Sequence, residues 1–474
     1  MKKITITKQR KEKANLLTKA RREIIVLVIL IMILLINPKT TKPTELSKEF
    51  FREPNLGILY LAAILDQNNI PVEILDLEQY YGLESDEINE IITEKITHYD
   101  IIGITSLTNT FHLTIRIAKL VKNCSKEKVV VLGGPHVSFK YEEILNKEDS
   151  IDFICVKESE NSFPDLIDLI TSVLNKNGLI HDYEKELNKI KGLAYKNLKG
   201  EIVFTGFPKT VKIDNLPLPA RYLLSQENFY YRVASVIINR GCPNQCSFCS
   251  RQKMSPVVRI RSLDSILSEI RDIATYQTYD YINFYDNINI NREFFHGFCR
   301  LFIDNKINIP WGCELRVDTI TSEDANLLKK AGCRLVATGI ESASLEVLKK
   351  NLKYQDPKQV LTGIRHLKAV NIPIQAYFVL GLPGETELSF LKTVEFIKNL
   401  PFNSDDRINY FAATPYPGSR LWDEKDYFKL NIVELDYTKY DCQHIIFETY
   451  DLDLKKLKSL FSIAKETEKL FTQT

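Results

Sequence analysis

Three closely spaced cysteines are the strongest chemical signal in the sequence. Cys242, Cys246 and Cys249 lie in Arg240-Gly241-Cys242-Pro243-Asn244-Gln245-Cys246-Ser247-Phe248-Cys249, a C-x3-C-x2-C spacing. Thiolates are the usual ligands of iron–sulfur clusters, so three on one loop can hold three irons of a cubane and leave the fourth iron without a protein ligand. An open iron suits a small chelating molecule, because structural metal sites are closed by four ligands.

Two other interpretations of the cysteines remain open. A zinc site normally requires a fourth Cys or His at short spacing, and the next cysteine is Cys299, 50 residues after Cys249. The other is that the three are unrelated buried cysteines.

The first half of the chain predicts a doubly wound parallel sheet. Between Met32 and about residue 175, five apolar strand candidates alternate with helical stretches, at 33–36, 72–77, 101–106, 128–132 and 151–156. Ligands of such sheets bind at the strand carboxyl ends, which here are Ser106-Leu107-Thr108, Gly133-Gly134-Pro135-His136 and Glu158-Ser159-Glu160. Alternatively, Gly133-Gly134 is only a tight turn and His136 a helix-start residue without a metal.

The second half predicts a partial barrel of six βα units, with its site at the strand carboxyl ends. Its strand candidates are 235–239, 281–285, 309–317, 334–340, 374–380 and 407–412, so the cysteine loop directly follows the first strand. The expected organisation is an extension (1–31), a first domain (32–175), a linker with a small β element (176–232), a second domain (233–450) and a carboxyl-terminal helix (451–474).

With the cysteine loop in this position, the chain resembles radical S-adenosylmethionine (SAM) enzymes that have an amino-terminal cobalamin (B12)-binding domain, such as anaerobic tetrapyrrole cyclases and B12-dependent methylases. Phe248 before the last cysteine agrees with that family, as do five strand-end segments: Phe284-Tyr285-Asp286-Asn287, Arg316-Val317-Asp318, Gly339-Ile340-Glu341-Ser342, Gly381-Leu382-Pro383-Gly384-Glu385 and Pro415-Tyr416-Pro417-Gly418. The likeness covers nearly everything from Met32 onward. It implies a Rossmann-like cobalamin-binding domain followed by a TIM-type (βα)6 radical SAM barrel.

The resemblance implies that the amino and carboxylate groups of SAM chelate the open iron of a [4Fe-4S] cluster. An electron then cleaves the sulfonium, and the resulting 5′-deoxyadenosyl radical abstracts a substrate hydrogen. The outcome is methylation of a carbon through methylcobalamin, or a radical oxidation or cyclisation. The SAM contacts that the resemblance implies are Phe248, Asp286, Glu341, Gly381 and Gly384, with the two glycines allowing close approach of the backbone.

For cobalamin, the resemblance points to Ser106, Gly133, Gly134 and His136, with the corrin between the two domains. Two departures matter. No D-x-H-x-x-G motif occurs, so no histidine in that motif replaces the lower ligand of cobalt. Around Glu158, Lys157 and Ser159 stand where the family usually has glycine. We expect a bulky residue at position 134 to block close approach of the corrin and to strain the turn.

Two alternative functions stay in view. A radical tRNA methylthiotransferase would carry three further cysteines in its first domain, where this chain has Cys124 and Cys155, and a small carboxyl-terminal RNA-binding domain. A non-catalytic corrinoid or iron–sulfur binding protein would lack the barrel-end segments.

Composition and charge narrow the partners. The 474 residues carry 63 Lys+Arg against 61 Asp+Glu, so nucleic acid is not expected as a partner. Nine scattered cysteines favour a reducing cytoplasm. Residues 1–22 hold nine basic residues and precede 13 apolar ones, Ile24 to Ile36, too few for a membrane span. Residues 1–31 are expected to be a basic membrane-surface anchor or an extension upstream of a true start at Met32. The remaining expected partners are an electron donor such as ferredoxin or flavodoxin and a small-molecule or peptide substrate.

Overall fold

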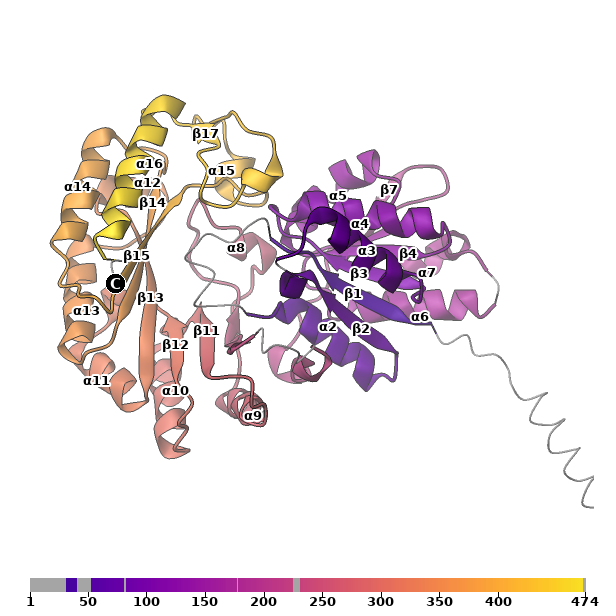
Figure 1. Cartoon of the computed structure of the whole chain (residues 1–474), viewed down its shortest axis with the longest axis horizontal. Coiled ribbons are helices and arrows are strands. Elements are labelled where there is room, and N and C mark those ends of the chain that lie inside the picture. The colour runs from indigo at the N-terminus through magenta and orange to yellow at the C-terminus, as the bar shows by residue number, and fades with distance from the viewer. Residues whose placement is uncertain (1–30, 41–52, 81, 177, 225–230, 472–474) are drawn as a thin grey trace, which may run out of the picture.

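The computed structural model describes residues 31–40, 53–80, 82–176, 178–224 and 231–471. These residues form two α/β domains joined side by side (Figure 1). The expected extension lies outside the described residues except for Ile31, which is buried in the first domain and packs with β1. The first core therefore includes one residue that the sequence analysis assigned to the extension. No helix in the described ranges combines the length and apolar character needed to cross a bilayer.

The first domain is built on a seven-stranded sheet in the order β2-β1-β3-β4-β5-β6-β7. Its parallel strands are β1 (Ile33–Asn37), β2 (Val72–Asp76), β3 (Ile101–Thr105), β4 (Val129–Gly133) and β5 (Phe153–Cys155). Both faces are covered, because α3 (Ser85–Ile96), α4 (Phe111–Cys124) and α5 (Pro135–Lys147) pack on one side, and α2 (Leu56–Gln67) and α6 (Ser162–Leu174) on the other.

The continuous apolar run in β1 reflects this double coverage. Leu34 and Ile36 point into the core under α3 and α4, whereas Ile33 and Leu35 point into the core under α2 and α6. A strand buried on both faces needs apolar residues at every position. The expectation of a doubly wound sheet is confirmed.

The small β element of the expected linker belongs to this sheet. β6 (Leu193–Lys196) and β7 (Ile202–Phe204) form a hairpin around Gly200, and β6 pairs antiparallel with β5. The hairpin covers the edge that β5 would otherwise leave unpaired. The small β element expected in this segment is therefore present, and its pairing with β5 adds the information, absent from sequence spacing, of which sheet the hairpin joins.

The second domain is a six-stranded, fully parallel partial barrel in the order β15-β14-β13-β12-β11-β8. Its strands are β8 (Val233–Val236), β11 (Tyr281–Asn287), β12 (Trp311–Glu314), β13 (Cys333–Glu341), β14 (Ile374–Leu380) and β15 (Arg407–Ala412). The helices that follow in the chain are α9 (Leu263–Ile273), α10 (Arg292–Asp304), α11 (Ser322–Lys330), α13 (Pro357–Ala369) and α14 (Glu387–Lys398). The expected tail helix is α16 (Leu454–Lys469), which packs on β14, β15 and α14.

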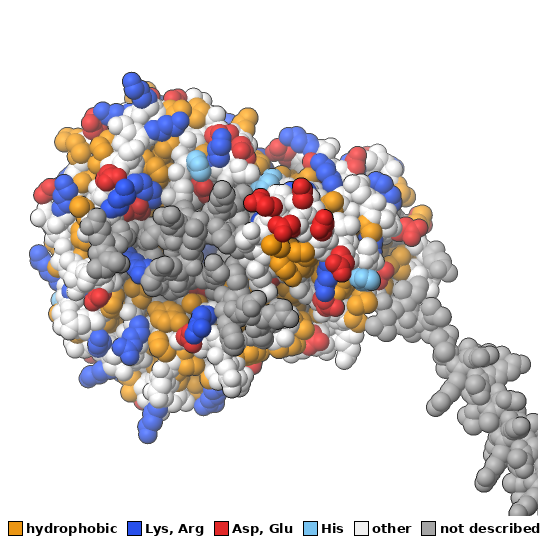
Figure 2. All heavy atoms as spheres, viewed as in Figure 1, with side chains coloured by type: hydrophobic (Ala, Val, Ile, Leu, Met, Phe, Trp, Pro, Cys, Tyr) orange, Lys and Arg blue, Asp and Glu red, His pale blue; other side chains and the backbone are white. Residues whose placement is uncertain are grey.

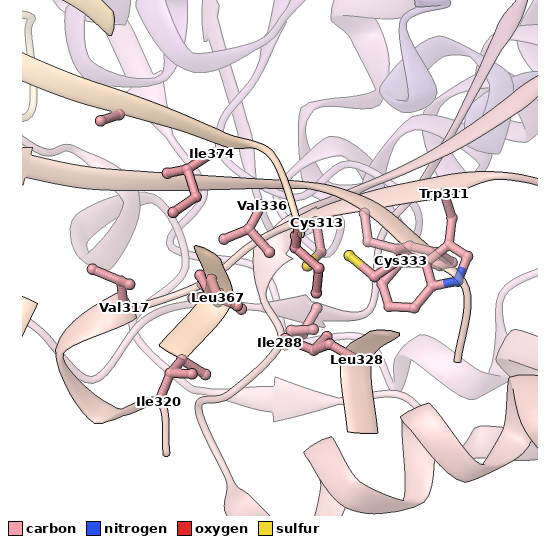
Figure 3. Packing of buried hydrophobic residues seen from close by; sticks show 14 of the residues in the cluster. Ile288, Trp311, Cys313, Val317, Ile320, Leu328, Cys333, Val336, Leu367 and Ile374 are labelled. Carbon is pink, nitrogen blue, oxygen red and sulfur yellow. The ribbon is translucent and has the colours of Figure 1, made fainter. Parts of the chain in front are cut away.

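The two faces of this second sheet differ in polarity. Alternate residues of each strand pack under the helices in one large apolar core, part of which Figure 3 shows around Trp311, Cys313 and Val336. The intervening residues form what we call the inner face, which includes Ser235, Asn283, Tyr285, Glu314, Gln375, Tyr377 and Asn409. Alternation of side chains along each strand produces this division.

Candidate functional site

The loop between β9 (Asn239–Arg240) and α8 (Arg251–Met254) carries Cys242, Cys246 and Cys249. Two hydrogen bonds between Ser247 and Asn351 hold the loop in place. The Ser247 hydroxyl donates to the Asn351 amide oxygen at 2.7 Å, and the Ser247 backbone N–H donates to the Asn351 carbonyl at 3.0 Å. Gly241 begins the loop at φ 82°, and a Cβ there would lie 2.7 Å from the Val257 carbonyl oxygen. Only glycine fits that combination of angle and space.

Hydrogen-bond donors point at two of the thiols. The Asn244 amide donates to the Cys242 sulfur at 3.6 Å, and the Arg251 backbone N–H donates to the Cys249 sulfur at 3.4 Å. Burial raises the pKa of Cys246 to about 11, while the Lys353 ammonium opposes that shift. Donors and a nearby cation both favour thiolates, the form that binds iron.

The three thiols fit a cubane cluster in their chemistry. Each thiolate of a cluster binds a different iron, so the sulfurs need not converge on one point. Within the described ranges, no three His, Cys, Asp or Glu side chains gather closely enough to hold a single metal ion. The predicted ligands Cys242, Cys246 and Cys249 are thus carried by one loop that has donors suited to thiolate sulfur.

A cavity of about 570 Å³ lies between the domains, beside this loop. From the first domain it is lined by Leu35, Gly103, Thr105, Gly133, Gly134 and Phe163, and from the second by Arg240, Cys249, Arg251, Met254 and Asp286. The carboxyl ends of β3 and β4 therefore face the cysteine loop across one space. The sheet order changes direction between β1 and β3, which is where doubly wound sheets bind ligands.

The floor of the cavity fits a large flat ligand at Gly133. A Cβ built on Gly133 meets no atom within 4 Å, so the space beside it is open. Gly134 differs, because its φ is 102° and a Cβ there would lie 2.7 Å from the Ser106 carbonyl oxygen. A Cβ at position 134 would thus point at backbone, in line with the expected strain of the turn, while the block to the corrin at position 134 stays a prediction; the open space lies beside Gly133.

Two further residues expected near cobalamin lie outside the cavity lining. Ser106 is buried in the turn, where its backbone N–H donates to the Gly133 carbonyl at 2.9 Å. His136 is also buried, with its ring between Phe111 and Tyr437 and its Nδ1 3.2 Å from the Thr108 hydroxyl. Burial lowers the pKa of His136 to about 3, so it stays neutral and packs the domain interface.

Of the residues expected to contact SAM, Asp286 lines the cavity. Its carboxylate accepts backbone N–H groups of Ile238 at 2.9 Å and Asn239 at 3.2 Å and pairs with Arg251. Phe248 packs with the apolar cluster around Leu382 and Leu421 instead of lining the cavity, which makes it an anchor for the loop. Glu341 is buried, has φ 64° and pairs with Lys353 at 2.9 Å. A non-glycine residue in the left-handed region costs about 1–3 kcal/mol, and such strain clusters at functional sites.

The positive φ angles at positions 381 and 384 explain why glycine occupies them. Their φ values are 88° and 84°, and a Cβ would meet the Leu457 side chain at 3.4 Å and the Lys350 side chain at 2.6 Å, respectively. The Gly381 N–H donates to the buried Glu385 carboxyl at 2.6 Å. Close approach to a ligand is thus not the reason that the structure gives for these glycines, and contact with SAM stays a prediction.

An ion network that is largely shielded from solvent, and that sequence analysis missed, joins the domains at the cavity wall. Glu158 accepts Arg259 Nη1 at 2.9 Å and the Ser255 hydroxyl at 2.7 Å, and Arg240 pairs with Glu160. Burial would raise the pKa of Glu158, but Arg259, Arg240 and Ser255 outweigh it and hold the pKa below its ordinary value. We call Glu158, Glu160, Arg240 and Arg259 the interdomain clamp.

The clamp accounts for one departure from the family pattern. Lys157 stands where the resemblance leads us to expect glycine, and its φ is 66°, in the left-handed region that favours glycine. The turn keeps that conformation and presents Glu158 and Glu160 to the second domain. The available signal was Arg240, directly before the cysteine loop, but its partner lies 80 residues away.

Comparison with known proteins identifies both domains. Residues 236–397 match the radical SAM superfamily, and residues 50–167 match the B12 binding domain. An uncharacterized methyltransferase of Pyrococcus horikoshii is 29% identical over 377 residues, covering 78% of each chain. The anaerobic magnesium-protoporphyrin IX monomethyl ester cyclase of Rubrivivax gelatinosus is 28% identical over 384 residues, covering 78% of this chain and 66% of the cyclase.

Solved structures agree in fold. The radical SAM methyltransferase TsrM from Kitasatospora setae, with cobalamin and a [4Fe-4S] cluster bound, has a TM-score of 0.69 at 16% identity and covers 93% of this chain and 89% of TsrM. The cobalamin-dependent radical enzyme OxsB, with aqua-cobalamin and SAM bound, has a TM-score of 0.64 at 17% identity and covers 93% and 62% of the two chains.

The cysteine loop gives the first prediction. Anaerobic reconstitution of the wild-type chain should give about four irons per chain, because three thiolates hold a cubane. Replacing Cys242, Cys246 and Cys249 together by alanine should remove the iron, and Cys442→Ala, at a half-buried cysteine outside the loop, is the control. Iron and sulfide analysis measures the result, and iron retained by the triple variant would contradict the assignment.

The second prediction concerns the adjacent glycines Gly133 and Gly134. Gly133→Leu should lower hydroxocobalamin binding at least tenfold and leave unfolding unchanged, because its side chain enters open space. Gly134→Ala should destabilise the first domain by about 1–3 kcal/mol through its backbone angle. Visible absorbance of bound corrin and denaturant unfolding separate the two effects. Equal corrin binding by Gly133→Leu and wild type would show that the cradle lies elsewhere.

The interdomain clamp gives the third. A double-mutant cycle of Glu158→Gln and Arg259→Gln should give a coupling energy of roughly 1–3 kcal/mol at pH 7, measured by unfolding. The exposed pair Glu143 and Lys147, 2.8 Å apart, is the control and should couple by about 0.5 kcal/mol or less. Because the pKa of Glu158 is lowered on folding, the coupling should be present at neutral pH and disappear as pH falls below the ordinary glutamate range. A coupling energy equal to that of the control pair would show that Glu158 and Arg259 do not act as a clamp.

Proposed function

The chain belongs to the radical SAM superfamily and carries a B12-binding domain, and from this we propose that it is a cobalamin-dependent enzyme that methylates a carbon of a small organic substrate. One observation carries the proposal. A single cavity is bounded by the glycine floor of the first sheet and by the cysteine loop of the second. Two cofactors that serve one substrate must share such a space.

When bound, the cofactors supply a 5′-deoxyadenosyl radical at the cluster and a methyl carrier at the corrin. The chain supplies position and shelter. Ser247 and Asn351 hold the cysteine loop, and Asp286 ties Arg251 to the backbone that leads into it. Leu35, Ile58, Leu61 and Phe163 line the cavity with apolar surface, which limits the water available to quench a radical.

The interdomain clamp adds a distance constraint. Arg240 lies two residues before Cys242, so its pairing with Glu160 ties the cluster-bearing loop directly to the end of β5. The clamp residues therefore act as positioning residues for both cofactor sites.

The methylthiotransferase alternative finds little support in the first domain. Cys124 is exposed at the end of α4, whereas Cys155 is buried in β5 and has its pKa raised to about 12 by burial. One thiol is at the surface and the other is in the core, so the two are not placed to bind one cluster together.

Radical SAM chemistry needs a reductant and a substrate. For this chain we propose a ferredoxin-type or flavodoxin-type donor and a reducing cytoplasmic environment, since all nine cysteines are free. On the face shown in Figure 2, Lys and Arg side chains are interspersed with Asp and Glu. We propose no nucleic acid partner, and the membrane-surface role predicted for residues 1–31 concerns a segment whose structure is not described beyond Ile31.

The experiment that tests the function follows the fate of SAM. The anaerobic full chain, given SAM, a reductant and hydroxocobalamin, should form both 5′-deoxyadenosine and S-adenosylhomocysteine. The triple cysteine variant should lose 5′-deoxyadenosine, and Gly133→Leu should lose S-adenosylhomocysteine. Formation of 5′-deoxyadenosine without S-adenosylhomocysteine would replace methylation by oxidation or cyclisation, and absence of both would indicate a binding protein.

A further inference from the structure

The inner face of the second sheet holds two carboxylic acids that the cysteine loop, the cavity and the clamp do not use. Glu53 comes from the segment that precedes α2, and Glu314 ends β12. They come from distant parts of the chain, yet the charge of Glu53 raises the pKa of Glu314, and both acids raise the pKa of Tyr285, so the two acids lie near each other on the inner face. Two half-buried acids that face each other without a cation between them call for another explanation.

Glu53 is held in place by the inner face. Its carboxylate accepts the Asn283 amide N–H at 2.8 Å and the Ser235 hydroxyl, and Tyr285 is a third hydrogen-bond partner. Burial nevertheless raises the pKa of Glu53 to about 7, because three donors offset only part of the desolvation. Donors without positive charge orient this acid and leave its charge unneutralised.

The Glu314 carboxyl has no hydrogen-bond partner among the described residues, although the Glu314 backbone carbonyl accepts the Ile288 N–H at 3.1 Å. Burial raises its pKa to about 7 as well. The nearest cations are both engaged, since Arg251 pairs with Asp286 and Lys353 pairs with Glu341 at 2.9 Å. The titratable groups that face Glu314 from the surrounding elements are Glu53, Arg251, Tyr285, Glu341, Lys353 and Tyr377.

Aromatic side chains stand beside the two acids. Tyr285 lies on β11, Tyr377 on β14 and Phe411 on β15, and the rings of Tyr377 and Phe411 are 5.7 Å apart. Burial raises the pKa of both tyrosines far above neutrality, so their hydroxyls stay neutral. Aromatic faces attract organic cations, and carboxylates supply the opposite charge.

We propose that the inner face is a binding site for an organic cation, a primary ammonium or guanidinium carried on an apolar body, with Glu314 as its counter-charge and the aromatic rings as its walls. The inference deepens the proposed function, on which it rests for the identification of this ligand as the substrate. An anion would meet two carboxylates there. A cation would supply the neutralising charge that Glu314 lacks.

Fluorine NMR of a charged and an uncharged probe tests the site. 4-Fluorobenzylamine and 4-fluorobenzyl alcohol have nearly the same shape, and the anaerobic full chain with its cluster is titrated with each. The amine line should broaden, with an affinity at least tenfold higher than that of the alcohol. Its affinity should also rise roughly tenfold between pH 6 and pH 8, as an acid with pKa near 7 ionises while the ammonium, like that of lysine, stays charged.

Isosteric variants locate the site. Glu314→Gln should weaken amine binding at least tenfold and flatten its pH profile, and Glu53→Gln should have a smaller effect because Glu53 is held by three donors. Glu323→Gln, at an exposed position on α11 behind the sheet, is the matched control and should bind like wild type. Iron content and unfolding verify that each variant is folded.

The outcomes separate this inference from the proposed function. Equal binding of amine and alcohol, or an unchanged pH profile in Glu314→Gln, would overturn the cation site even if SAM is cleaved. The wild-type pH profile tests the site without any substitution, so a variant that fails to fold does not remove the test. Amine binding that depends on Glu314 in a chain that cleaves no SAM would keep the site and reject the enzymatic proposal.

Discussion

The interdomain clamp joins the two domains beside the cavity, which three of its residues, Glu158, Glu160 and Arg240, help to line. Its acids lie on the turn after β5 and its arginines flank the cysteine loop, so one set of charges joins the two edges that border the cavity. Removing such ions from water costs several kcal/mol each, and close pairing offsets much of that cost. The net stability is therefore modest. What the pairs provide is a defined register between domains, because any shift would leave a buried charge without its partner.

Topology makes the clamp useful. In both domains the parallel strands end toward the junction, so loops at their carboxyl ends meet across the cavity. Parallel sheets with covered faces place their ligands at that edge. Local chemistry then shapes the space: glycine at position 133 leaves the floor without a side chain, and Asp286 draws Arg251 against the backbone that leads to the cysteine loop.

Sequence was sufficient for features encoded locally. The three thiols lie within eight residues of one loop, and the alternation of strand and helix segments along the sequence predicted both sheets. The sequence was insufficient where three-dimensional geometry decides which of two neighbouring residues faces the cavity. Gly133 and Gly134 are alike in sequence, yet only Gly133 faces open space, and Phe248, next to Cys249, packs in an apolar cluster that the sequence does not reveal. Contacts across the chain were also hidden, because Glu53 meets Asn283 over 230 residues of separation.

The unusual inner face is sustained by the opposite face of the same sheet. Keeping Glu314 ionised costs roughly 3 kcal/mol for a pKa raised to about 7. Behind it, Phe284 packs edge to face against Phe298, Phe302 and Trp311 in the helix-covered core, and burying one such ring contributes about 1.5–3 kcal/mol. The burial of two such rings therefore offsets the free-energy cost of keeping Glu314 ionised. The sheet can keep acids that weaken its own folding, because its apolar face supplies the stability and leaves the polar face free for chemistry.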